Sequence, residues 1–171
     1  MRKLLLLVVF AFSLACSKDD DNNNVPNTGN ADLTARLVGN WEMTDLYYDA
    51  SVPNPLNPFS PINLSGPAEN VYGDFNISAS PNNVDYNYGF DIESPLDPTQ
   101  SFPITQVGQG TWNVTSNGTK VVVEQSNNTT TTYTVQENEI NRQVWTAKVP
   151  TTVPGFNITV NADIRITLIR K

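Results

Sequence analysis

Three pairs of carboxylates are spaced so that acid–base chemistry on extended strands is conceivable. They are Asp45 with Asp49, Asp91 with Glu93, and Glu137 with Glu139. A glycosidase needs two carboxylates across a cleft that holds a sugar. The second and third pairs would each lie on one face of a strand, but nothing in the sequence links them to a sugar-binding groove. We therefore interpret all three pairs as solvent-facing charges.

Most other familiar active sites are excluded by residue type. The chain has no histidine and one cysteine, so the commonest proton shuttle and metal ligand is missing and no internal disulfide forms. The run Asp19 to Asn22 offers oxygen ligands for calcium, yet it lacks the glycine turn and terminal glutamate of an EF-hand loop. We predict no catalytic residues, no metal and no cofactor, and we expect a protein that is not an enzyme.

The charge balance argues against nucleic acid as a partner. Ten lysines and arginines face seventeen acidic residues, which gives a net charge of −7. Phosphate binding needs clustered cations, and the nearest candidates are Arg165, Arg170 and Lys171 on one terminal segment. These are ordinary surface or capping charges, so no nucleic-acid interface is expected.

The first residues have the build of a secretory signal. Arg2 and Lys3 precede an apolar run from Leu4 to Phe12, which is too short to span a bilayer. Ala15 before Cys16 resembles the lipobox of bacterial lipoproteins, and that resemblance implies cleavage after residue 15 and lipidation of Cys16. Acyl chains would then hold the protein to a membrane. A plain secretory signal followed by a structural cysteine is the alternative.

An acidic, polar stretch follows the cysteine. It begins with Lys18, Asp19, Asp20 and Asp21. This run resembles the acidic tether of Bacteroidota lipoproteins, which implies delivery to the outer face of the outer membrane; the alternative is a solvated charge run. Residues 16–30 contain almost nothing to bury, so we expect a disordered tether. Once the signal peptide, residues 1–15, is removed, Arg2 and Lys3 are lost and the net charge becomes −9.

The remaining residues, 31–171, are predicted to form one all-β domain, monomeric, with one short N-terminal helix. Leu33 and Leu37 lie four apart before Gly39, which indicates a helix over 31–38. Beyond it, apolar and polar residues alternate in segments rich in Val, Ile, Thr, Tyr and Trp. Eight strands are predicted, at 41–49, 71–79, 84–92, 107–115, 119–125, 130–136, 140–148 and 157–170.

The connections favour an antiparallel up-and-down barrel. Tight turns at 80–83, 116–118 and 137–139 would share one end, whereas long proline-rich connections at 52–70, 94–106 and 149–156 would share the other. Alternation places Ile158 and Arg170 on one face of the last strand, and Tyr88 and Phe90 on one face of the third. For 140–148 either face could be the inner one. A β-sandwich, which would separate Arg170 from Trp41, is the alternative architecture.

A family resemblance supports the barrel. Gly39-Asn40-Trp41 after a short helix is similar to the G-x-W start of lipocalins, and residues 37–43 resemble the opening of Bacteroidota lipocalin-like lipoproteins. Gly110-Thr111-Trp112 leading through Asn117-Gly118 into the strand at 119–125 resembles the middle hairpin of that group. The resemblance implies a lipocalin-like barrel in which an arginine of the last strand packs over the tryptophan. The alternation along the last strand places Arg170 on its inward face, so we expect a cation–π contact with Trp41.

The long connection at 51–67 and the inward aromatics together predict a ligand site at the open end. Leu56, Phe59, Ile62 and Leu64 are apolar residues among stiff prolines, so this connection is either a lid or a loop packed on the rim. The candidate ligand-binding residues are Tyr47, Phe59, Tyr88, Phe90, Tyr133 and Ile158. Such aromatics also occur as plain core.

Two functions are consistent with these features. The first is a surface-anchored, outer-membrane lipoprotein whose barrel binds a small apolar or amphipathic ligand. The second is a non-carrier interaction module or inhibitor, in which loops on a solid barrel bind a protein or a glycan. An internal cavity of several hundred Å³ would favour the first, and a packed interior with exposed apolar loop tips would favour the second.

Overall fold

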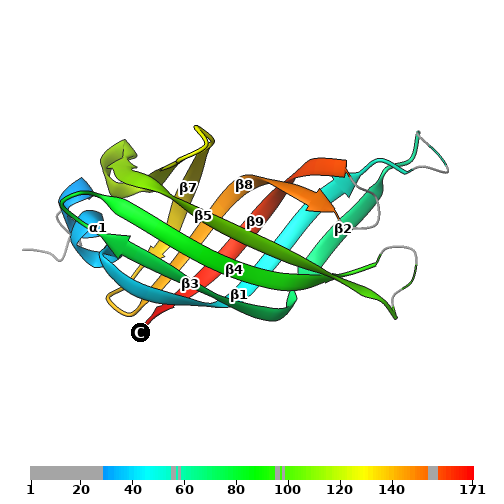
Figure 1. The fold of residues 1–171 in the computed structure, drawn as a ribbon, viewed down its shortest axis with the longest axis horizontal. Helices are drawn as coiled ribbons and strands as arrows, with labels where there is room; N and C mark the ends of the chain where they lie inside the picture. The colour runs from blue at the N-terminus through cyan, green and yellow to red at the C-terminus, as the bar shows by residue number, and fades with distance from the viewer. Residues whose placement is uncertain (1–28, 55–56, 58, 95–96, 98, 154–157) are drawn as a thin grey trace, which may run out of the picture.

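The protein folds as one antiparallel sheet that curls back on itself (Figure 1). The computed structural model describes residues 29–171 except 55–56, 58, 95–96, 98 and 154–157. The strand order is β2-β1-β3-β4-β5-β6-β7-β8-β9, and an additional pairing of β1 with β9 closes the ring. The predicted antiparallel up-and-down barrel with one short helix is confirmed. Cys16 and the tether residues Lys18 to Asp21 lie outside the described residues.

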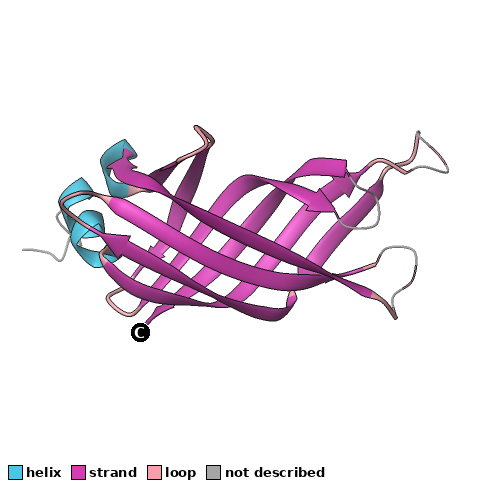
Figure 2. Ribbon diagram, viewed as in Figure 1, coloured by secondary structure: helices cyan, strands magenta, loops and turns pink. Residues whose placement is uncertain are grey.

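Within the described residues, strands make up nearly all of the regular structure (Figure 2). The helix α1 spans Gly29–Leu37, and the single-turn 3-10 helix η1 spans Ser116–Gly118. The strands are β1 (Gly39–Val52), β2 (Ile62–Pro67), β3 (Glu69–Ser78), β4 (Asn83–Glu93), β5 (Ser101–Thr115), β6 (Lys120–Gln125), β7 (Thr130–Asn138), β8 (Arg142–Val153) and β9 (Ile158–Arg170). No helix in this part of the chain is long and apolar enough to cross a membrane.

Alternation along the strands places the core inside the barrel. In β4, Val84, Tyr86, Tyr88, Phe90 and Ile92 are all buried, as their spacing predicts for residues on one face of a strand. β9 buries Ala162, Ile164, Ile166 and Leu168 in the same way. In β8 the inner face is that of Trp145 and Ala147, whereas Ile140 is exposed before the strand begins.

β1 carries a β-bulge that changes which side chains face inward. Its pairing with β9 shifts register between Met43 and Asp45. Trp41 and Met43 are buried, and after the bulge the buried residues are Leu46, Tyr48, Ala50 and Val52. A bulge adds one residue to one strand and so reverses the inside–outside alternation beyond it. The prediction that Tyr47 faces the interior is therefore wrong, because Tyr48 takes that place and Tyr47 lies on the outer face.

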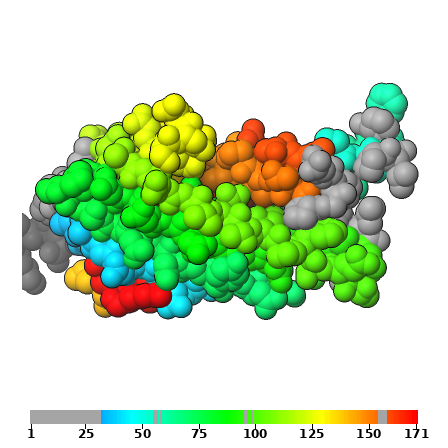
Figure 3. Space-filling view, viewed as in Figure 1, coloured from blue at the N-terminus to red at the C-terminus, as the bar shows by residue number. Residues whose placement is uncertain are grey.

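A strand occupies part of the connection that was expected to be a loop. β2 pairs with the second half of β1, from Tyr47 opposite Pro67 to Val52 opposite Ile62. The hairpin that these strands form extends beyond the end of the barrel opposite α1 (Figures 1 and 3). That end, where β1, β4 and β8 end and β2, β5 and β9 begin, is called the open end below; the end covered by α1 is called the closed end.

Two strands are longer than predicted and have one unpaired edge each. β5 begins at Ser101, and its residues 101–109 pair with β4 but with no second strand among the described residues. β8 continues to Val153, and its residues 147–153 pair only with β9. Pro103 and Pro150 lie in these segments. Proline lacks the N–H that a central strand needs, so both positions suit an edge and oppose pairing with another chain.

Candidate functional site

The interior of the barrel is the first candidate site, and it is filled by aromatic side chains. The Phe75 ring stacks on Tyr88 with centroids 5.5 Å apart and on Tyr86 at 5.6 Å. Tyr133 lies 5.3 Å from Trp145, which meets Phe75 edge-on. Gly108 sits opposite Tyr86, where a β-carbon would collide with the tyrosine ring. These contacts fill the half of the interior nearer α1.

The spaces that remain between the described side chains are small. One void of about 10 Å³ lies among the aromatic residues around Tyr133 and Trp145. Another of about 20 Å³ lies nearer the open end, between Tyr48, Phe90, Ile104 and Val160. A single water needs roughly 10–15 Å³, and sites for small organic ligands measure roughly 300–1,000 Å³. Neither void is large enough for a small organic ligand.

The predicted wall residues are therefore part of the packed core. Tyr88, Phe90 and Tyr133 are buried, and Ile158 is half-buried and packs against the same core. Desolvation by burial raises the pKa of Tyr88, and the neighbouring Tyr86 adds to it. Burial likewise raises the pKa of Tyr133 well above its usual value. The two phenols are therefore neutral at pH 7, and both side chains are packed as core residues.

Phe59 is the predicted site residue that lies apart from the others. It is 97% exposed and follows two turns built by asparagines: the Asn57 side chain accepts a hydrogen bond from the Phe59 N–H at 3.2 Å, and the Asn54 carbonyl accepts one from the Asn57 N–H. Leu64 behaves differently, because it is buried at the open end. The described part of 51–67 thus combines a strand packed on the rim with a tip that presents Phe59; Leu56 lies outside the described residues.

At the closed end, Gly39, Trp41 and Arg170 form the predicted structural cluster. The Arg170 guanidinium lies over the Trp41 ring, 4.4 Å from its centroid, and the two residues are partners in the β1–β9 ladder. Arg170 also donates hydrogen bonds to the carbonyls of Ile140 at 2.7 Å, Val38 at 2.9 Å and Arg36 at 2.5 Å. It therefore ties the last strand to the end of α1 and to the β7–β8 turn.

The close approach of Arg170 explains the glycine before the tryptophan. Gly39 has a φ of +145°, and a β-carbon there would overlap a guanidinium nitrogen of Arg170. Trp41 adds a buried hydrogen bond from its indole N–H to the carbonyl of Leu37, 2.7 Å away. The Gly-x-Trp motif thus lets the strand start beneath the helix and reach the arginine.

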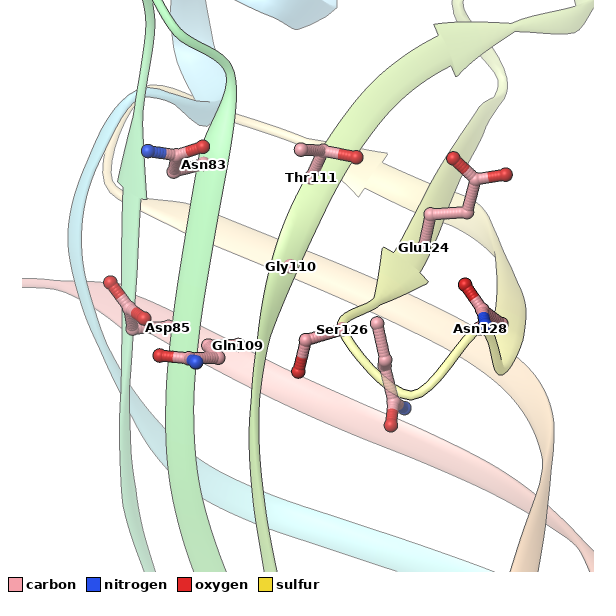
Figure 4. Close-up of a pocket in the computed structure, with 9 residues that line it drawn as sticks. Asn83, Asp85, Gln109, Gly110, Thr111, Glu124, Ser126 and Asn128 are labelled. Atoms are coloured by element: carbon pink, nitrogen blue, oxygen red, sulfur yellow. The ribbon is translucent and has the colours of Figure 1, made fainter.

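A polar hollow of about 520 Å³ on the outer surface is a feature that sequence reasoning missed (Figure 4). Asn83 and Asp85 from β4, Thr111 from β5 and Glu124 from β6 line it, together with residues of the turn after β6. Gly110 and Thr111 of β5 pair with β4 on one side and with β6 on the other, so residues distant in sequence come together. Among the described residues, no group of histidine, cysteine and acidic side chains is arranged to hold a metal ion.

The carboxylate pairs singled out from their spacing lie on the surface with ordinary partners. Asp91 accepts a hydrogen bond from the Asn70 side chain at 2.6 Å, and Glu137 forms an ion pair with Arg142. Asp45 and Asp49 lie on the outer face of β1. The interpretation of these residues as solvent-facing charges agrees with this geometry.

Comparisons with known proteins add little to this description. No family model matches the chain, and no curated protein matches it. Among solved structures, the chain is similar to the S-type phycobiliprotein lyase CPES from Guillardia theta, with 9% sequence identity and a TM-score of 0.38 over 85% of this chain and 94% of that one. We draw nothing from a likeness at that TM-score. The barrel assignment rests on strand order and on the β1–β9 pairing.

Proposed function

We propose that the protein is a non-enzymatic, lipid-anchored interaction module of the outer membrane surface, whose solid barrel presents the open end to a protein partner. The observation that carries this proposal is the filled interior. The voids of about 10 and 20 Å³ between the described core residues leave no room for a small lipophilic ligand among those residues. Of the two functions consistent with the sequence, this favours the non-carrier module.

The placement of the helix supports an orientation for the anchored protein. Gly29 begins α1 at the closed end, opposite the β1–β2 hairpin. A chain anchored at Cys16 would reach the domain at that end through 13 residues, which span at most about 45 Å when extended. The closed end is then the tethered end, which leaves the open end free to meet a partner.

Phe59 is the residue best suited to a contact at that end. Burying a phenylalanine that is 97% exposed removes about 150–250 Å² of mostly apolar surface from water. The two asparagine-built turns restrain the backbone at Phe59, which lowers the entropy cost of ordering this loop on binding. Aromatic residues of this kind dominate the energetics of protein interfaces.

Site-specific crosslinking on intact cells tests the contact. A photoreactive phenylalanine analogue would replace Phe59 in one variant and Tyr72, which is 53% exposed on the barrel wall, in a matched control. We expect a discrete crosslinked protein from position 59 and not from position 72. The proposal is contradicted if position 59 gives no crosslink, or if both positions give the same products.

Two variants test the anchoring separately. Cys16→Ala should release the protein from the membrane fraction and abolish acyl labelling, and continued labelling would rule out lipid at that residue. Replacing Lys18, Asp19, Asp20 and Asp21 by alanine should protect the protein from protease added outside the cell. Unchanged cleavage would contradict an export role for these four residues.

A further inference from the structure

The outer wall made by β7, β8, β9 and β1 contains a second surface feature, which we call the outer groove. It consists of two adjoining hollows of about 410 and 580 Å³ that share Thr146 and Arg165. Strand register explains the shared residues: Tyr47 pairs with Arg165, Arg165 with Thr146, and Thr146 with Thr134. The four side chains form one row across the four strands, which lie in that order in Figure 1.

Arg165 is the cation of this groove that carries no carboxylate partner. The neighbouring Lys148 is bound to Asp163 at 2.5 Å, and Arg142 is bound to Glu137. Arg165 forms no such ion pair within the described part of the chain, and its guanidinium lies 5.6 Å from the centroid of the Tyr47 ring. A guanidinium has five N–H donors in a planar fork that matches a carboxylate, and it stacks readily on an aromatic ring.

Hydroxyls and an amide form part of the lining of the groove. Thr132, Thr134 and Thr146 come from β7 and β8, and the Gln136 side chain donates a hydrogen bond to the Thr146 hydroxyl at 3.2 Å. The aliphatic residue Val144 is only 5% exposed, so the groove offers little to apolar peptide side chains. Hydroxyls that both donate and accept, beside a half-exposed tyrosine ring, suit the hydroxyl-rich surface of a saccharide.

The acidic residues of the groove limit the charge of its ligand. Asp45 and Asp49 flank Tyr47 along β1, and Asp163 and Glu137 lie in the same two hollows. A polyanion would meet several like charges here and be repelled. A saccharide with a single carboxylate would place that group on Arg165 while its hydroxyls donate to the aspartates.

We propose that the outer groove binds a saccharide bearing one carboxylate, which Arg165 and Tyr47 hold in place. This site is separate from the open end and does not depend on the contact proposed for Phe59. An acidic sugar unit within an otherwise neutral glycan has the required chemistry.

NMR titration of the protein, purified with its N-terminal segment intact, tests the proposal. The probes are 3′-sialyllactose and methyl β-D-glucuronoside, with lactose and methyl β-D-glucoside as their neutral counterparts and sodium acetate as the bare carboxylate. We expect at least one acidic saccharide to shift the Arg165 side-chain N–H and Tyr47 ring signals saturably. Its neutral counterpart and acetate should bind at least about tenfold more weakly, as expected for losing about 1.4 kcal/mol of contacts.

Matched variants distinguish the site from general binding. Arg165→Met should weaken binding of the acidic saccharide by about tenfold or more, since it removes the charge-assisted hydrogen bonds, and Tyr47→Leu should weaken it by a smaller factor. Tyr72→Leu, at another exposed tyrosine on the outer wall, should leave it unchanged. The proposal is overturned if neither acidic saccharide shifts the Arg165 signal, if acetate binds as well as the saccharides, or if Arg165→Met binds like the unmodified protein.

Discussion

Replacing Arg170 by methionine should be among the most destabilising changes at a residue that is only half-buried. The guanidinium donates three hydrogen bonds to carbonyls at the closed end and lies over Trp41. Because those carbonyls regain some water when the arginine is removed, each bond counts for about 1 kcal/mol. The cation–π contact adds about 0.5–1 kcal/mol. The expected loss is therefore about 3.5–4 kcal/mol of the free energy of unfolding.

Urea denaturation followed by tryptophan fluorescence measures this loss. Arg165→Met is the matched control, because Arg165 is on the same strand but faces outward, and it should cost less than about 1 kcal/mol. A double-mutant cycle with Trp41→Leu should give a coupling of about 0.5–1 kcal/mol with Arg170→Met. Strict additivity, or equal losses for the two arginine variants, would refute the assignment of Arg170 as the tie at the closed end.

Three further predictions concern the closed end and the core. Gly39→Ala should lower the free energy of unfolding by about 2 kcal/mol or more, because the φ of Gly39 is +145° and the new methyl group meets Arg170. Gly66→Ala, with open space around it, is the control and should cost about 0.5 kcal/mol or less; equal effects of the two variants in thermal melts would contradict this prediction. Burial raises the pKa of Tyr88 and Tyr133 in the folded state, so the stability that these phenols contribute is complete below the unfolded pKa of about 10 and falls as pH rises above it. Absorbance at alkaline pH should accordingly show that they ionise only on unfolding, and ionisation of all tyrosines near pH 10 in the folded protein would contradict their burial. Phe75→Ala should cost about 3–5 kcal/mol in urea denaturation, since it leaves a cavity among stacked rings; a loss under 1 kcal/mol would mean that these rings do not pack as described.

The sequence predicts the barrel well where alternation is long and uninterrupted. β4 and β9 each alternate over more than ten residues, and their inner faces are those expected. The pairing of Trp41 with Arg170 follows from the same parity, since the last strand must return beside the first to close the ring. Because side chains alternate between the two faces of a strand with a period of two, one inward-facing residue predicts the others along the whole strand.

The prediction fails where one residue breaks that period. The bulge between Met43 and Asp45 moves Tyr47 outside and Tyr48 inside. A signal was present, since Leu46, Tyr48, Ala50 and Val52 form an apolar alternation of their own. A bulge is local in sequence, but its position depends on how β1 packs between β3 and β9. The sequence of β1 alone does not reveal that packing.

The predicted ends of two strands are wrong because prolines near them favour loops. Pro103 and Pro150 argue for loops when read locally, yet both lie in strands with one unpaired edge, where a missing N–H costs nothing.

The surface sites were not predicted for a different reason. The outer groove draws Tyr47, Thr134, Thr146 and Arg165 from four strands, and only the register between those strands brings them into one row.

Titration of the full-length protein with cis-parinaric acid, a fluorescent fatty acid, tests the claim of a solid barrel most directly. Trp145 lies in the interior beside Tyr133 and Phe75, so a fatty acid inside the barrel would quench tryptophan emission by energy transfer. With voids of about 10 and 20 Å³, we predict no saturable one-to-one binding. Saturable binding of one molecule, with matching loss of tryptophan emission, would contradict the account and identify the protein as a carrier.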